Sequence, residues 1–132
     1  MTSFRRPPLA RIALAASLLL AASLSHALTV APYTPAALAS AQKAGEPLVL
    51  HFHASWCPTC RAQDKAFDAL KADPALKVTL MEVDYDREKA LEKQMRVTAQ
   101  STLIVFHGGT ERGRSTGETD PARLKATLQS AL

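Results

Sequence analysis

The two cysteines of this chain, three positions apart, constrain what it can fold into more than any other feature. They lie in the run Trp56-Cys57-Pro58-Thr59-Cys60, after an apolar run at 48–52 and before a helix predicted at 58–71. A Cys-x-x-Cys pair between a strand and a helix is typical of a redox site. Unpaired N–H groups and the helix dipole at a helix start favour the thiolate form of Cys57. Cys60, one turn later, is within reach to close a disulfide.

Disulfide exchange needs an exposed, activated sulfur that attacks and a more buried sulfur that resolves the mixed disulfide. Two other interpretations of the pair are a zinc site and a structural bridge. A zinc site needs further ligands, and His51, His53 and His107 lack ligand spacing, so we expect no metal here. A structural bridge would close a very small loop and would remove little chain entropy. The redox interpretation is therefore favoured.

Residues 1–27 have the three parts of a secretory signal peptide. Arginines at 5, 6 and 11 precede an apolar segment at 12–24, and the tripeptide Ser-His-Ala at 25–27 offers small residues to a signal peptidase. Cleavage is expected after Ala27. The alternative is an uncleaved anchor, but this apolar segment is short for a membrane span, which needs about 20 residues. We expect an exported, periplasmic domain at 28–132.

Charge narrows the range of partners. The formal net charge is +4 at pH 7, but the predicted leader holds three of the 16 basic residues and none of the 12 acidic ones. The mature chain is thus nearly neutral. Its sequence shows no basic patch of the kind that would predict a nucleic-acid partner. Outside the cytosol, exposed dithiols become oxidised unless a dedicated partner reduces them. We therefore expect the cysteine pair to exchange electrons with other proteins.

The rest of the chain alternates between predicted strands and helices. We expect strands at 28–30, 48–54, 77–84, 102–107 and 111–116, and helices at 34–45, 58–71, 86–96 and 120–132. Thr-Pro at 34–35 and Asp-Pro at 120–121 are helix-start signals, Asp86 is a further candidate cap, and Gly-Gly at 108–109 predicts a hairpin. Strands separated by helices pair in parallel, so the expected fold is α/β, a mixed sheet with helices on both faces.

This order of elements, with Trp-Cys-x-x-Cys after the second strand, resembles the thioredoxin superfamily over nearly all of residues 28–132. The Trp-Cys-Pro-Thr-Cys string is also similar to that of exported thioredoxin-like proteins that reduce apocytochrome c, which are longer. The resemblance implies a thioredoxin fold, protein thiols and disulfides as partners, and no bound cofactor. It makes Cys57 the nucleophile and Cys60 the resolving thiol, with Trp56 shielding the site and Gly117 beside the substrate groove. Pro58 and Thr59 complete the supporting motif.

The chain departs from the family at a buried aspartate, which is replaced by His51, and at a lysine, which is replaced by Glu82. The family pair helps to move the proton of the resolving cysteine, and a neutral imidazole is capable of the same work. Our hypothesis is that His51 and Glu82 form the equivalent pair, with the positions of the acid and the base exchanged. The alternatives are a core histidine bonded to a backbone carbonyl and a Glu82 that faces water. His53 and His107 are interpreted as structural or solvent-facing.

A third departure is the loss of the family's cis-proline, whose position is taken by Ser101, followed by Thr102. A non-proline residue prefers the trans bond by about 2.5–4 kcal/mol. We expect a differently shaped loop opposite Cys57, where the family backbone holds an extended substrate strand. Ser101 and Thr102 are thus candidate substrate-binding residues, and the Ser101 hydroxyl is a candidate donor to the Cys57 thiolate.

These observations predict an exported, monomeric thiol–disulfide oxidoreductase, with the reductase direction favoured, that a membrane electron donor of the periplasmic reducing pathway re-reduces. The alternative is a thioredoxin-fold binding module without general turnover, which holds a specific partner or a soft metal such as Cu(I). A third possibility is an oxidase that introduces disulfides.

Overall fold

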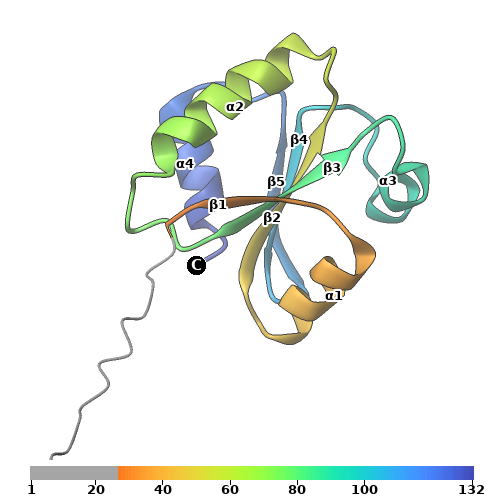
Figure 1. The fold of residues 1–132 in the computed structure, drawn as a ribbon, viewed down its shortest axis with the longest axis horizontal. Coiled ribbons are helices and arrows are strands. Elements are labelled where there is room, and N and C mark those ends of the chain that lie inside the picture. Colours follow the sequence, from red (N-terminus) through yellow and green to blue (C-terminus); the bar gives the residue numbers. More distant parts are fainter. Residues whose placement is uncertain (1–26) are drawn as a thin grey trace, which may run out of the picture.

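The structure, a computed structural model, describes residues 27–132, and the predicted leader at 1–26 lies outside the described residues. Strands and helices alternate along the chain in the predicted order (Figure 1). The elements are β1 (Thr29–Pro32), α1 (Pro35–Lys43), β2 (Pro47–His53), α2 (Pro58–Leu70), β3 (Thr79–Asp84), α3 (Lys89–Met95), β4 (Thr102–His107), β5 (Thr110–Thr116) and α4 (Pro121–Gln129).

The five strands form one mixed sheet in the order β1-β3-β2-β4-β5. The β1–β3 and β3–β2 pairs are parallel, whereas β2–β4 and β4–β5 are antiparallel. Helices α2 and α4 cover one face of the sheet, and α1 and α3 cover the other (Figure 1). The predicted α/β fold, a mixed sheet with helices on both faces, is therefore confirmed.

Strand β2 is the centre of the sheet and is buried on both sides. Its apolar residues, Leu48, Val49, Leu50 and Phe52, are 0% exposed. Side chains alternate along a strand, so Leu48, Leu50 and Phe52 join the core under α1 while Val49 joins the core under α2. The same alternation sends His51 to the α2 face, where its ring packs against Phe67. A polar ring is thus buried directly beneath the helix that carries the cysteines.

Three helices begin with the same local device, a side chain that caps the first turn, followed by proline. Thr34 accepts a hydrogen bond from the Ala37 N–H, and Asp120 accepts one from the Arg123 N–H. Proline fits the first helical position because its missing N–H would have no partner there. Helix α2 begins in the same way with Cys57 before Pro58, so the cysteine occupies a capping position.

Several predicted boundaries were wrong. Helix α3 begins at Lys89, and its cap position is Glu88, not Asp86. The Asp86 N–H instead donates to the Asp84 carboxylate at 3.0 Å, which holds residues 85–87 in a turn. Strand β1 extends to Pro32, β3 starts only at Thr79, and α4 ends at Gln129. Among residues 27–132, none of the helices combines the length and apolar character that a membrane crossing requires.

Candidate redox site at the start of helix α2

The Cys57 sulfur caps helix α2. Its Sγ accepts a hydrogen bond from the Cys60 N–H at 3.1 Å, and its backbone is extended (φ −85°, ψ 111°). The residue is only 1% exposed and packs with Ala54 and Cys60 beside Tyr85. The expectation that the attacking sulfur would be exposed was wrong, because the cap position turns it in over the helix end. The predicted placement at the helix N-terminus is confirmed.

Cys60 lies one turn further into the helix and is 0% exposed. Burial, together with a smaller contribution from a hydrogen bond with Cys57, raises the pKa of the Cys60 thiol to about 11. Cys60 is therefore a neutral thiol at physiological pH. The two sulfurs are therefore unequal, because Cys57 Sγ accepts from the Cys60 N–H at the start of the helix, whereas Cys60 is the buried thiol. This asymmetry is consistent with the prediction that Cys57 attacks and Cys60 resolves, which stays a prediction.

Trp56 is the large exposed side chain beside the cysteines. It is 54% exposed, and its indole N–H donates to the Asp86 carboxylate at 2.9 Å. This bond ties the ring to the turn after β3, so the indole face is held at the surface next to the sulfur. Pro58 is exposed at the helix start and Thr59 is half-buried.

The loop before β4 places Ser101 in the left-handed region, at φ +60°, which is uncommon for a residue with a side chain. All peptide bonds of the described residues are trans, as expected for a serine at this position. The Ser101 N–H donates to the Phe52 carbonyl at 2.8 Å, and its own carbonyl accepts from the Gly117 N–H at 3.0 Å. The Ser101 hydroxyl donates to the Gln100 carbonyl at 2.5 Å. The expectation that this hydroxyl would donate to Cys57 was therefore wrong, because the hydroxyl donates to the Gln100 carbonyl instead.

Thr102 and Gly117 complete this region. The Thr102 hydroxyl donates to the Ala99 carbonyl at 2.8 Å and lies 2.9 Å from the Thr116 hydroxyl, so it is satisfied within the protein. Gly117 adopts φ +74°, a conformation that glycine tolerates best. The structure thus brings two predicted substrate-binding residues, Ser101 and Gly117, into direct contact, whereas their contact with substrate stays a prediction.

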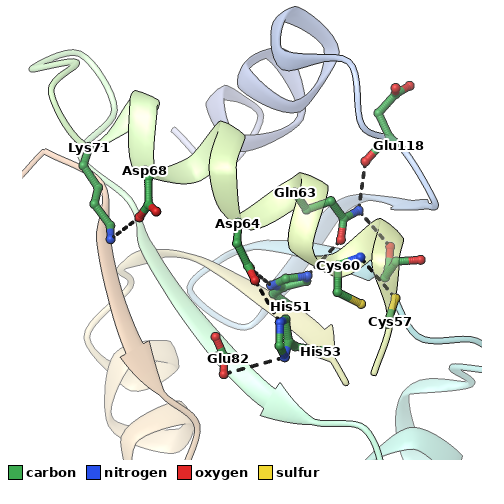
Figure 2. Close-up of polar contacts among 11 residues, drawn as sticks. His51, His53, Cys57, Cys60, Gln63, Asp64, Asp68, Lys71, Glu82 and Glu118 are labelled. Atoms are coloured by element: carbon green, nitrogen blue, oxygen red, sulfur yellow. Dashed lines mark hydrogen bonds and ion pairs between the residues drawn. The ribbon is translucent and has the colours of Figure 1, made fainter. Parts of the chain in front are cut away.

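His51 is fully buried, and its tautomer follows from its neighbours. The Gln63 amide donates to the Ser101 carbonyl at 3.1 Å. It also donates to the Glu118 carbonyl at 2.9 Å (Figure 2). Its oxygen is therefore left to accept from His51 Nε2, at 2.9 Å, which places the proton on Nε2 and a lone pair on Nδ1. Burial lowers the pKa of His51 to about 4. The ring is thus neutral, and in residues 27–132 no hydrogen bond joins it to either cysteine.

The hypothesis of a His51–Glu82 pair was wrong. Although the two residues are opposite one another in the β2–β3 register, the Glu82 carboxylate is 45% exposed and lies 3.9 Å from His53 Nδ1. The carboxylate nearest to His51 is that of Asp64, with 4.0 Å between Oδ1 and Nδ1. The physical reason is that α2 covers His51 from above, so a helix residue, and not the neighbouring strand, supplies its charged neighbour.

Sequence comparisons decide the family. A sequence model of the thioredoxin family matches residues 30–130. The chain belongs to the thioredoxin family. It is 36% identical to a thioredoxin of Echinococcus granulosus over 94 residues, which cover 71% of this chain and 86% of the relative.

Solved structures agree with this membership. The thioredoxin-like protein Trxlp of Edwardsiella tarda superposes with a TM-score of 0.72 at 40% identity, covering 76% of this chain and 98% of that one. Oxidised thioredoxin O2 of Arabidopsis thaliana superposes with a TM-score of 0.63 at 27% identity, covering 79% and 93%. With an intact Cys57–Cys60 pair, this thioredoxin-family protein is a protein thiol–disulfide oxidoreductase, and its general partners are protein disulfides.

Sequence reasoning missed two residues that organise this thioredoxin site, Gln63 and Asp64. Gln63 is 0% exposed, whereas Ala62 and Ala69 of the same helix are exposed. The available signal was helical spacing, because Gln63 lies three and four positions before the buried Ala66 and Phe67. A polar residue on that face indicates a buried hydrogen-bond network.

Proposed function

We propose that this thioredoxin-family protein is an exported reductase that reduces disulfides of client proteins in the periplasm. The observation that supports this best is the unequal environment of its two sulfurs: Cys57 caps the helix as a hydrogen-bond acceptor, whereas Cys60 is a buried, protonated thiol. The Pro58-Thr59 pair between them, similar to that of exported reductases, favours the reductive direction.

The reaction is an exchange of two electrons. The Cys57 thiolate attacks one sulfur of the client disulfide, the client S–S bond breaks, and a mixed disulfide forms. The released client thiolate takes up a proton. The Cys60 thiol then loses its proton and attacks Cys57 Sγ, which releases the second client sulfur as a thiol. The client has gained two electrons and two protons, and the protein holds a Cys57–Cys60 disulfide.

The high pKa of the Cys60 thiol means that its proton must leave as the bond forms. The departing client sulfur is the acceptor that we propose, because it becomes basic at that moment and lies at the same bond. A role for His51 in this step stays a prediction. An unchanged pH profile of Cys57 alkylation in His51→Ala would remove His51 from the mechanism.

Export rests on the leader sequence and on the domain boundary. Among the described residues, Leu28 is the first one in the core under α2, and it is 5% exposed. Cleavage after Ala27 would therefore leave the folded domain intact. The protein would act as a monomer and be re-reduced by a membrane electron donor. Expression of the full chain, cell fractionation and mass determination of the mature N-terminus test this directly. A product that starts at Met1 in the cytosol would refute export.

One measurement tests the redox direction, and two further experiments test turnover with client proteins. The reduction potential of the Cys57/Cys60 couple is expected near the thioredoxin value of about −270 mV, and a value near about −120 mV would show an oxidase instead. In Cys60→Ser, the resolving step is blocked, so client proteins should accumulate as mixed disulfides in the cell envelope. Insulin reduction beside a Cu(I) titration separates turnover from the alternative of a binding module.

A further inference from the structure

A second cluster of reactive side chains lies on the α2 face of the sheet, beside the buried His51. His53 of β2, Asp64 of α2 and Glu82 of β3 each offer one ligand atom, and these atoms lie within 4.8 Å of one another. His53 Nε2 is 2.9 Å from Asp64 Oδ2, and His53 Nδ1 is 3.9 Å from Glu82 Oε1 (Figure 2). One imidazole and two carboxylates from three separate elements are a donor set that suits a divalent transition-metal ion.

An independent observation at the same place points to a missing partner. Nδ1 of His51, 0% exposed, has no hydrogen-bond partner within residues 27–132. Because Gln63 fixes the proton on Nε2, Nδ1 carries a lone pair. The nearest carboxylate oxygen, Asp64 Oδ1, lies 4.0 Å away and is also an acceptor, so the two atoms cannot form a hydrogen bond with each other. Burial of an unsatisfied acceptor is unfavourable. A cation bound to Asp64 would resolve this opposition and would meet a neutral imidazole nitrogen ready to coordinate.

The cluster is open to solvent on its other side. A pocket of about 350 Å³ is lined by His53, Ser55, Glu82, Asp84, Asp86 and Arg87. Three of the six lining residues are carboxylates, and the only cation, Arg87, lies 3.5 Å from Asp84. The pocket is therefore net negative, which attracts cations and gives an ion a route to His53.

An ordinary ion pair would explain only part of this arrangement. A charged hydrogen bond between His53 and Asp64 accounts for the contact of 2.9 Å. A protonated imidazole donates from both ring nitrogens, so ion pairing also covers the Glu82 contact, but it leaves the His51 nitrogen without a partner. A cation held by one His53 nitrogen and by Asp64 would account for that buried nitrogen as well.

We propose that His53, Asp64 and Glu82 bind a divalent transition-metal ion, with Zn²⁺ the best match, and that His51 Nδ1 is its inner fourth donor. Tetrahedral Zn²⁺ takes nitrogen and carboxylate ligands at about 2.0–2.2 Å. Ligands at these distances from one ion lie about 3.3 Å apart, so the His51–Asp64 separation of 4.0 Å would shorten and the His53–Asp64 contact of 2.9 Å would lengthen, each by roughly half an ångström, which a partly exposed Asp64 side chain allows. The site is separate from the cysteines and does not depend on the proposed direction of electron flow.

The test uses the oxidised full chain, in which the Cys57–Cys60 disulfide prevents the thiols from binding metal. Isothermal titration with Zn²⁺ is expected to show one site, and Co²⁺ is expected to give tetrahedral absorption bands without a thiolate charge-transfer band. Failure of the oxidised protein to bind Zn²⁺ at micromolar concentrations would overturn the proposal.

Matched variants assign the ligands. Asp64→Asn, His53→Ala and Glu82→Gln should each weaken Zn²⁺ binding by about tenfold or more. Asp68→Asn is the control, because Asp68 lies one turn further along α2 and pairs only with Lys71 among the described residues. Equal affinities of the Asp64 and Asp68 variants would refute the site. Glu82 is exposed, so its variant keeps the test valid if His53→Ala fails to fold. Unchanged affinity in His51→Asn would exclude His51 as the fourth donor.

Discussion

The side-chain amide of Gln63 donates a hydrogen bond of 3.1 Å to the backbone carbonyl of Ser101, across 38 residues of sequence. The same amide group reaches the Glu118 carbonyl, and its oxygen accepts from His51. One buried glutamine of α2 thus holds three other segments: β2, the loop before β4 and the loop after β5. The left-handed conformation of Ser101 persists because bonds from several directions over-determine it.

Replacement of this glutamine should destabilise the whole domain. Gln63→Ala leaves the buried imidazole N–H of His51 and the Glu118 carbonyl without their partner, while the Ser101 carbonyl keeps its bond from the Gly117 N–H. Each unsatisfied group costs about 1–3 kcal/mol, partly relieved by relaxation. We expect the free energy of unfolding, measured by urea denaturation, to fall by about 3 kcal/mol. Gln129→Ala, at the exposed end of α4, is the control and should change it by less than about 0.5 kcal/mol. Equal effects of the two substitutions would contradict the role of Gln63.

The two cysteines should differ sharply in reactivity. Burial keeps the pKa of Cys60 at about 11, so at neutral pH its unreactive thiol form dominates. Brief treatment of the reduced protein with iodoacetamide should modify Cys57 and leave Cys60 unmodified, as judged by peptide mass spectrometry. The control is the unfolded protein in urea, in which both should react. Modification of Cys60 in the folded state as fast as Cys57 would refute the assignment of their roles.

His51 should make the fold sensitive to acid. Its pKa is lowered by burial from 6.5 to about 4, so the unfolded chain binds a proton that the folded protein does not bind between these values. The free energy of unfolding therefore has its full value above about pH 6.5. It falls as the pH decreases towards 4, by about 3 kcal/mol in total. The groups facing the ring are Asp64 on α2 and His53 on β2. Urea denaturation in EDTA across this range measures the loss, and His51→Asn should abolish most of it. An equally steep loss in that variant would exclude His51 as the cause.

Trp56 should contribute to client binding more than to stability. Its side chain is 54% exposed, so Trp56→Ala should change the free energy of unfolding by less than about 0.5 kcal/mol. Exposed aromatic anchors commonly contribute more than about 1 kcal/mol to an interface, so kcat/KM for insulin reduction should fall about fivefold or more. Val30→Ala, an exposed apolar residue of β1, is the control and should leave kcat/KM unchanged. A loss of stability without a change in kcat/KM would reverse this interpretation.

The order of elements could be predicted because β2 and β4 are apolar runs, Gly-Gly marks the turn before the polar strand β5, and α1, α2 and α4 start with a cap followed by proline. The capping position of Cys57 follows from Pro58, as it does for Thr34 and Asp120. The partners of His51, Glu82 and the Ser101 hydroxyl could not be predicted in this way. They depend on where α2 lies over the sheet and on bonds between residues far apart in the chain, which periodicity does not encode. Even the correct β2–β3 register does not say which way the Glu82 carboxylate turns.

The sulfur that reacts is also the group that secures the first turn of α2. Once Cys57 is joined to another sulfur, it has no negative charge and is a poorer acceptor for the Cys60 N–H. Every round of exchange thus loosens the end of the helix just when a client is attached there. The ring of Pro58 fixes φ at the first helical position and so helps to keep the turn formed while the mixed disulfide exists. This proline therefore has a structural role in addition to its place in the motif.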